Sequence, residues 1–171
     1  MATDARLRYL VREIEGLFAD AREGLPDDLF YLVSRLTPLV NVDLLIQNPE
    51  RETLLTWRDD PFHTGWHIPG GIIRFKERAV DRIRAVACLE LGATADPDPE
   101  PFEVHERQHR DRDVRGHFIS LIYRTRLISG PEPLLACPDV SRPRHGQWAW
   151  HRSCPSLLIS AHSVYRHLFD R

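Results

Sequence analysis

The sequence predicts an α/β domain in which helices cover a mixed β-sheet, with a helical extension in front of it. Three observations lead to this fold class. Apolar residues recur at helical spacing over the first part of the chain, short strand patterns dominate from residue 39, and one long amphipathic segment lies among the strands. Regular βαβ alternation is missing, which favours a mixed sheet between helices. With 171 residues, one domain can bury a sufficient core.

The extension comprises residues 1–37 and precedes a domain at 38–171. Its first helix carries an apolar stripe that includes Leu7, Leu10 and Val11, and its second helix runs from Asp27 to the residues before Pro38. An exposed stripe of this size would favour association. We therefore expect the stripe to be buried against the domain or a second subunit, which favours a homodimer.

The strand patterns and the helices of the domain follow in a clear order. A central helix is expected at 76–91 and a C-terminal helix at 153–171, with loops at 59–65 and 130–146 and a proline-rich connector at 95–102. We expect strands at 39–47, 53–58, 102–110, 117–128 and 147–152, and a short one that enters a glycine turn near residue 70.

The composition excludes several classes of protein. The net charge is −2 and the arginines are scattered, so we expect no nucleic-acid partner. No apolar run approaches the roughly 20 residues of a membrane span, and the N-terminus has no signal-peptide core. The three cysteines lack C-x-x-C spacing, which favours a reduced, cytoplasmic setting. His105 and His109 have the spacing of helical metal ligands, but their segment is a predicted strand, so we expect no metal there.

The segment 69–92 carries the strongest motif. It resembles the Nudix box, G-x5-E-x7-R-E-U-x-E-E-x-G-U, where U is aliphatic. The matching positions are Gly71, Glu77, Ala87, Glu90 and Gly92. The box would have Arg, Glu and Glu at Ala85, Val86 and Leu89, so one of three clustered carboxylates remains on this helix face.

Within the Nudix superfamily, the GDP-mannose mannosyl hydrolases lack the same glutamates, and the chain resembles them beyond the box. The shared segments are P-L-V-x-x-D at 38–43, a strand that ends at Arg58, a W-x-x-P-G-G approach at 66–71, and a late Pro-Asp followed by His145 and Trp150. The resemblance covers about residues 38–171. It implies a Nudix-fold α/β/α sandwich with a mixed sheet and an N-terminal helical extension.

The resemblance also implies a reaction. Water would attack the anomeric carbon of a nucleotide sugar such as GDP-mannose, with Mg2+, or Mn2+ in its place, stabilising the departing diphosphate. Glu90 and the carbonyl of Gly70 would bind the metal, and His145 would be the general base. Arg58 would neutralise charge on the diphosphate, and Asp43 would lie near the sugar or the catalytic network.

The chain departs from this branch at Arg144, where the branch has a metal-ligating Gln; Gln147 lies close by in the sequence. Two further functions therefore stay open. One is a Nudix hydrolase that attacks phosphorus in another nucleoside diphosphate derivative, and the other is a catalytically inactive Nudix-fold domain that binds a nucleotide or a partner. Glu77 is expected to order the loop before the helix, and Arg84 to take over the structural part of the missing box Arg.

Overall fold

The structure is a computed structural model that describes residues 2–169; the predictions for residue 1 and for 170–171 lie outside this range. The helices are α1 (Ala2–Glu15), α2 (Asp27–Leu36) and α3 (Ala79–Leu91), with 3₁₀ segments η1 (Ala21–Glu23), η2 (Pro133–Leu135) and η3 (Ser160–Phe169). The strands are β1 (Leu39–Leu45), β2 (Thr53–Asp60), β3 (His63–His67), β4 (Gly70–Ile72), β5 (Ala95–Pro97), β6 (Glu103–Gln108), β7 (His117–Leu127) and β8 (Trp148–His151).

The strands form a mixed sheet and a second, antiparallel one. In the first sheet β1 runs parallel to β7 and antiparallel to β4, while β5 and β6 both pair antiparallel with β7. In the second, β2 lies between β3 and β8. The backbone N–H of Leu54 donates to the carbonyl of Ile46, which joins the start of β2 to the end of β1. The predicted fold class, a mixed sheet with helices, is confirmed.

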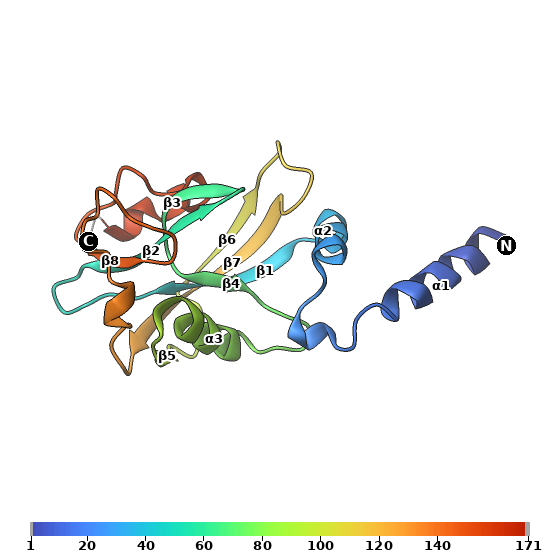
Figure 1. Cartoon of the computed structure of the whole chain (residues 1–171), viewed down its shortest axis with the longest axis horizontal. Coiled ribbons are helices and arrows are strands. Elements are labelled where there is room, and N and C mark those ends of the chain that lie inside the picture. The colour runs from blue at the N-terminus through green and yellow to red at the C-terminus, as the bar shows by residue number, and fades with distance from the viewer. Residues whose placement is uncertain (1, 170–171) are drawn as a thin grey trace.

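Helical segments cover the strands from two sides, with α3 on one side and the C-terminal segment on the other (Figure 1). Alternation along β1 explains this arrangement, since successive side chains of a strand point to opposite faces. Val42 and Leu44 pack with Ile83 of α3, whereas Leu45 packs with Tyr165 of η3. The polar side chain of Asp43 lies on the η3 side as well, where Tyr165 donates to it.

The expected loop at 59–65 is largely a hairpin. The carboxylate of Asp60 accepts hydrogen bonds from the backbone N–H groups of Phe62 and His63, at 2.8 and 2.9 Å. This side chain supplies the turn, so β2 continues to Asp60 and β3 begins at His63. The proline-rich connector also differs from expectation, because its first residues form the short strand β5.

Helix α3 begins at Ala79, three residues later than predicted. Lys76 has a φ of 58°, a left-handed conformation that interrupts a helix. Glu77 accepts a hydrogen bond from the backbone N–H of Arg74 at 2.8 Å, so this segment forms an ordered turn before the helix.

The N-terminal extension is divided between its two helices. Helix α2 contacts the domain: Ser34 accepts a hydrogen bond from the N–H of Arg115, and Tyr31 lies near Phe62. Helix α1 projects away from the rest of the molecule (Figure 1), and Leu7 and Leu10 are exposed. The expectation that this stripe is buried against the domain is wrong for α1; burial against a second subunit stays a prediction. In the part of the chain that is described, no helix has the length and apolar character needed to cross a membrane.

Candidate active site

Glu90 lies in the last turn of α3 with its side chain three-quarters buried. Its Oε2 atom is 3.1 Å from the hydroxyl of Thr56 on β2, and the backbone N–H of Gly70 also donates to the carboxylate. Burial raises the pKa of Glu90 to about 7, against the lowering effect of the Arg58 charge and of these hydrogen bonds. The carboxylate thus lies among groups from three parts of the chain.

The Thr56 hydroxyl also contacts His67 of β3, with 2.9 Å between Thr56 Oγ1 and His67 Nε2. His67 Nδ1 lies 2.8 Å from the carbonyl oxygen of Ile68, which can only accept, so Nδ1 carries a proton. Burial keeps the pKa of His67 well below its usual value, so the ring is neutral and Nε2 is an acceptor. Since Thr56 has one proton, it donates either to His67 or to Glu90. If Glu90 is protonated, it can donate to the Thr56 oxygen while Thr56 donates to His67, so every contact in this series of hydrogen bonds is satisfied. If Glu90 is ionised, it competes with His67 for the proton of the Thr56 hydroxyl.

Arg58 and His145 line the same cavity as Glu90. Arg58 follows Thr56 by two residues on β2, and strand alternation therefore places both side chains on one face. Its Nε is 3.6 Å from the carboxylate of Asp60. The structure brings these three predicted site residues together.

His145 itself is exposed and lies in the turn before β8. Its Nδ1 accepts a hydrogen bond from the backbone N–H of Asp59 at 3.0 Å, so the neutral ring carries its proton on Nε2. A general base needs a free acceptor nitrogen. This role therefore requires the ring to leave the Asp59 amide.

A second cavity, of about 140 Å³, adjoins the first, and Arg58 and His67 line both. Asp43 and Gly70 line this second cavity, so it contains the other two predicted site residues. Its polar lining is rich in groups that can carry positive charge or donate hydrogen bonds: Arg58, His63, His67, Arg107, His109, Arg115 and His162.

Asp43 is almost fully buried within a polar network. Its Oδ2 accepts a hydrogen bond from the hydroxyl of Tyr165 at 2.6 Å, and its Oδ1 accepts one from the amide of Asn41 at 3.0 Å. Arg107 lies 4.0 Å away. Burial raises the pKa of Asp43 in spite of the Arg107 charge and these donors. The carboxylate therefore fixes β1 to η3.

Gly70 and Gly71 permit close packing at the start of the box. A Cβ at Gly70 would lie 2.4 Å from Asp43 Oδ1, and one at Gly71 would lie 2.8 Å from Cγ2 of Val86. Both distances are shorter than any side chain tolerates, so glycine is required where β4 meets β1 and α3. This packing holds the Gly70 backbone beside Glu90.

Glu77 has the structural role expected of it, but its partner differs from the predicted one. Arg82 Nε donates to Glu77 Oε2 at 2.9 Å, and the Arg82 side chain is buried. Arg84, in contrast, is exposed. Arg82 lies on the face of α3 that packs against Gly71, so it reaches the carboxylate that Arg84 does not contact.

The position of the missing glutamine ligand is occupied by an exposed turn. The N–H of Arg144 donates to Gln147 Oε1 at 2.8 Å, so the side-chain oxygen of Gln147 closes this turn. The metal ligands expected from the resemblance are therefore oxygen atoms of Glu90 and Gly70. Thr56 adds a hydroxyl oxygen beside them. Hard cations such as Mg2+ bind oxygen donors and retain several waters, so this set fits a weakly held Mg2+.

Sequence reasoning missed Thr56 and His67 at Glu90, and Arg107, Arg115 and His162 in the second cavity. One signal could have found Thr56, since it lies two residues before Arg58 on the predicted strand. The remaining residues meet only through the pairing of distant segments. For example, the N–H of Ile68 donates to Nδ1 of His162 at 3.1 Å, across 94 residues.

Comparison of the sequence and structure with known proteins identifies the fold. No protein-family model matches the chain. The chain is 38% identical over 69 residues, 40% of its length, to the low-salt glycan biosynthesis protein Agl8 of Haloferax volcanii, and this stretch spans 44% of that protein. A MutT NUDIX hydrolase of Burkholderia pseudomallei has a TM-score of 0.61 and 20% identity, with 77% of this chain and 98% of that chain covered. A UDP-X diphosphatase has a TM-score of 0.57 and 16% identity, with 97% and 76% covered.

The fold is therefore that of the Nudix hydrolases. The similarity to the UDP-X diphosphatase covers nearly the whole chain, whereas that to the MutT hydrolase leaves about a quarter of it uncovered.

Proposed function

We propose that the protein is a Mg2+-dependent hydrolase of a nucleotide sugar, similar to GDP-mannose, in which water attacks the anomeric carbon of the sugar. One observation carries this proposal: Arg58 lines both cavities, with Glu90 and His145 in one and Asp43 in the other. A diphosphate at Arg58 would have the metal-binding carboxylate on one side and the polar cavity on the other. Such a position suits a group that joins a nucleoside to a sugar.

The charges of the second cavity support a diphosphate. Arg107 and Arg115 line it together with Arg58, and guanidinium groups bind phosphate oxygens in a bidentate manner. Asp43 is the acidic residue of this lining, and burial raises its pKa. The cavity thus attracts anions more strongly than the net charge of −2 would suggest.

In the reaction, the oxygen of water bonds to the anomeric carbon as the bond from that carbon to the diphosphate oxygen breaks. His145 takes the proton of the water after its ring leaves the Asp59 amide, and the products are a free sugar and a nucleoside diphosphate. Arg58 neutralises charge on the leaving diphosphate. Glu90 and the Gly70 carbonyl would bind Mg2+, which supplies further stabilisation of that charge. Asp43 positions β1 and η3 around the sugar.

The comparisons give this proposal limited support and also support a rival. The name of Agl8 refers to glycan biosynthesis. The name of the UDP-X diphosphatase indicates cleavage at a diphosphate, which favours attack on phosphorus as the second candidate function. A binding domain without activity is the third, because Arg144 replaces a metal ligand of the branch that the sequence resembles. In each case we expect a cytoplasmic protein.

The test is hydrolysis of a panel of nucleotide sugars with Mg2+ in water labelled with oxygen-18. Label in the released sugar supports the proposal, whereas label in the phosphate products supports attack on phosphorus. Glu90→Gln should lower turnover and weaken the dependence on Mg2+ together. Binding of nucleotides without hydrolysis of any member of the panel would leave the binding domain. Arg144→Gln adds a control, because it should raise affinity for Mg2+ if this turn lies at the metal.

A further inference from the structure

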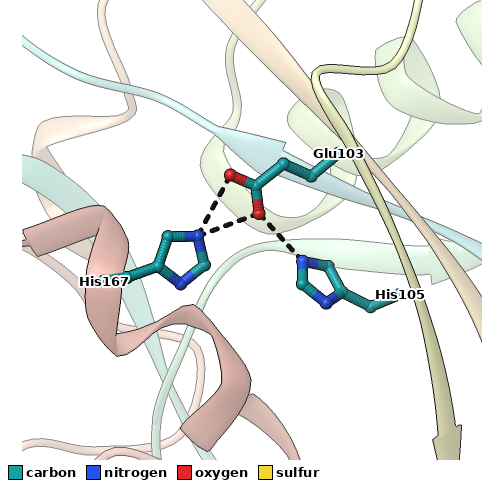
Figure 2. A group of neighbouring side chains, drawn as sticks. All are labelled: Glu103, His105 and His167. Carbon is teal, nitrogen blue, oxygen red and sulfur yellow. Dashed lines mark hydrogen bonds and ion pairs between the residues drawn. The ribbon is translucent and has the colours of Figure 1, made fainter.

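Three side chains outside the proposed active site converge on one point (Figure 2). Glu103 and His105 belong to β6, and His167 comes from η3. Within residues 2–169, these three form a group whose potential ligand atoms all lie within 4.8 Å of one another. Glu103 and His105 are two residues apart on a strand, so they share a face, and the C-terminal segment brings His167 to that face.

Two of the three separations between the potential ligand atoms are slightly shorter than those around a zinc ion. Glu103 Oε2 is 2.8 Å from His105 Nε2 and 2.9 Å from His167 Nε2. A tetrahedral zinc ion with bonds near 2.0–2.1 Å separates its ligand atoms by about 3.3 Å. An outward shift of about half an ångström by these partly exposed side chains would admit the ion.

The hydrogen bonds of His167 orient it as a ligand. Its Nδ1 lies 2.8 Å from the carbonyl oxygen of Val164, which can only accept, so Nδ1 carries a proton. The other nitrogen, Nε2, faces both oxygens of Glu103, at 2.9 and 3.0 Å. In a neutral ring this nitrogen is an acceptor that faces a carboxylate, and either a proton, as in a charged His167–Glu103 ion pair, or a metal ion must lie between the two acceptors. A metal ion meets this need, and a backbone carbonyl that binds the second nitrogen is the usual support of a histidine ligand.

The chemical types of the three ligands indicate which metal the site would prefer. Imidazole nitrogens favour Zn2+ and other transition metals over Mg2+ and Ca2+, and two His with one carboxylate form a common zinc set with water at the fourth position. Partial exposure of all three side chains leaves room for that water. The group also lies apart from Glu90 and Arg58, since none of its members lines either active-site cavity.

We propose that Glu103, His105 and His167 bind Zn2+ and that the ion fastens η3 to β6. The consequence for the molecule follows from what η3 carries. Tyr165 donates to Asp43, and the carbonyl of Ala161 accepts from Arg107 at 2.7 Å. Ala161 and His162 also line the second cavity. A zinc ion at this group would therefore stabilise one wall of that cavity.

The experiment uses the untagged full chain, freed of metals with a chelator and titrated with Zn2+ against a chromophoric chelator. We expect one tight equivalent in the natural protein. His105→Ala and His167→Ala should each weaken it at least tenfold, because even residues that only support a ligand contribute 10- to 100-fold to metal affinity. Co2+ in place of Zn2+ should give visible absorption bands that both variants lose. Zn2+ should also raise the melting temperature of the natural protein and not that of His167→Ala.

Two controls make the result specific. His117→Ala breaks a pair of the same kind, in which His117 Nε2 lies 3.0 Å from Glu106 Oε1, and it should retain the zinc equivalent. Glu90→Gln should retain it as well, which separates this site from the proposed Mg2+ site. Circular dichroism of each variant without metal checks folding, and Glu103→Gln replaces any variant that fails this check. Absence of a tight equivalent in the natural protein, or an affinity in His105→Ala and His167→Ala equal to that of the natural protein, would overturn the proposal.

Discussion

The ion pair between Glu77 and Arg82 should be a strong determinant of stability. The two side chains are 19% and 9% exposed, and Glu77 Oε2 lies 2.9 Å from Arg82 Nε. The same oxygen accepts the backbone N–H of Arg74, so the pair holds the turn that leads into α3. Removal of one partner from a buried pair costs about 3–5 kcal/mol, because the other charge stays buried without compensation. Since Glu77 retains some contact with water, Arg82→Met should cost about 3 kcal/mol, at the lower end of that range.

Methionine is the suitable replacement because the stem of Arg82 packs beside Gly71 and an unbranched apolar chain preserves that contact. The assay is urea unfolding of the natural protein, Arg82→Met, Glu77→Gln and the double variant. We expect a coupling energy of about 1.5–3 kcal/mol between the two positions. Asp81→Asn is the matched control, because it breaks the exposed pair with Arg78, the N-cap residue of the same helix, and should leave stability nearly unchanged.

A coupling energy below about 0.5 kcal/mol, the range of surface pairs, would refute this reasoning. It would mean that water reaches Arg82 in solution. The order of the turn at 73–78 would then depend on the backbone and on the packing of Gly71 alone.

Three further predictions concern single side chains. His145→Gln should lower kcat by about 10²–10⁴ with nearly unchanged nucleotide affinity, if His145 is the base; equal turnover would contradict that role. Thr56→Val should cost about 1–3 kcal/mol in urea unfolding, because it leaves Nε2 of buried His67 without a donor, whereas Thr56→Ser should cost less. Burial holds the pKa of His162 well below 6.5, so below pH 6.5 the unfolded chain binds a proton that the folded chain does not. The free energy of unfolding should therefore decrease as the pH is lowered below about 6.5. His162→Asn, which keeps an acceptor for Ile68, should reduce that slope by up to about 1.4 kcal/mol per pH unit, and an unchanged slope would contradict the assignment.

Local patterns predicted much of the fold because the strands alternate clearly and the box has fixed spacing. The strand β1 and the position of Glu90 on α3 both follow from such patterns. The turn between β2 and β3 was missed because it depends on one side chain, Asp60, that closes it with two backbone hydrogen bonds. Packing of α1 against the domain was predicted wrongly because an apolar stripe shows that a surface needs a partner and does not show which partner it has.

The residues of the candidate site likewise fall into those that a local pattern predicts and those that only the folded structure brings together. Glu90 belongs to the box and Arg58 ends a strand that resembles one of the branch, so the sequence identifies them. Thr56 and His67 are neutral in the folded protein, and their importance comes from contact with Glu90, which is 34 residues from Thr56. The proposed zinc group shows the same limit. His105 drew attention for its spacing to His109, but it lies in a group with Glu103 and His167, and His167 is 64 residues from Glu103.

The loss of the box glutamates has a physical consequence for how a metal would bind. Val86, in place of one glutamate, is part of the core and packs on Gly71, while Leu89, in place of the other, is exposed. Glu90 is therefore the one box carboxylate on this face, and burial raises its pKa to about 7 in spite of the Arg58 charge and the hydrogen bonds from Thr56 and the Gly70 N–H. A carboxylate that is partly protonated at neutral pH binds Mg2+ weakly on its own, and Mg2+ in such sites is commonly held by one or two carboxylates together with substrate phosphates. In the proposed reaction, Mg2+ would thus enter with the diphosphate, and its charge would favour the ionised form of Glu90 only when the substrate is present.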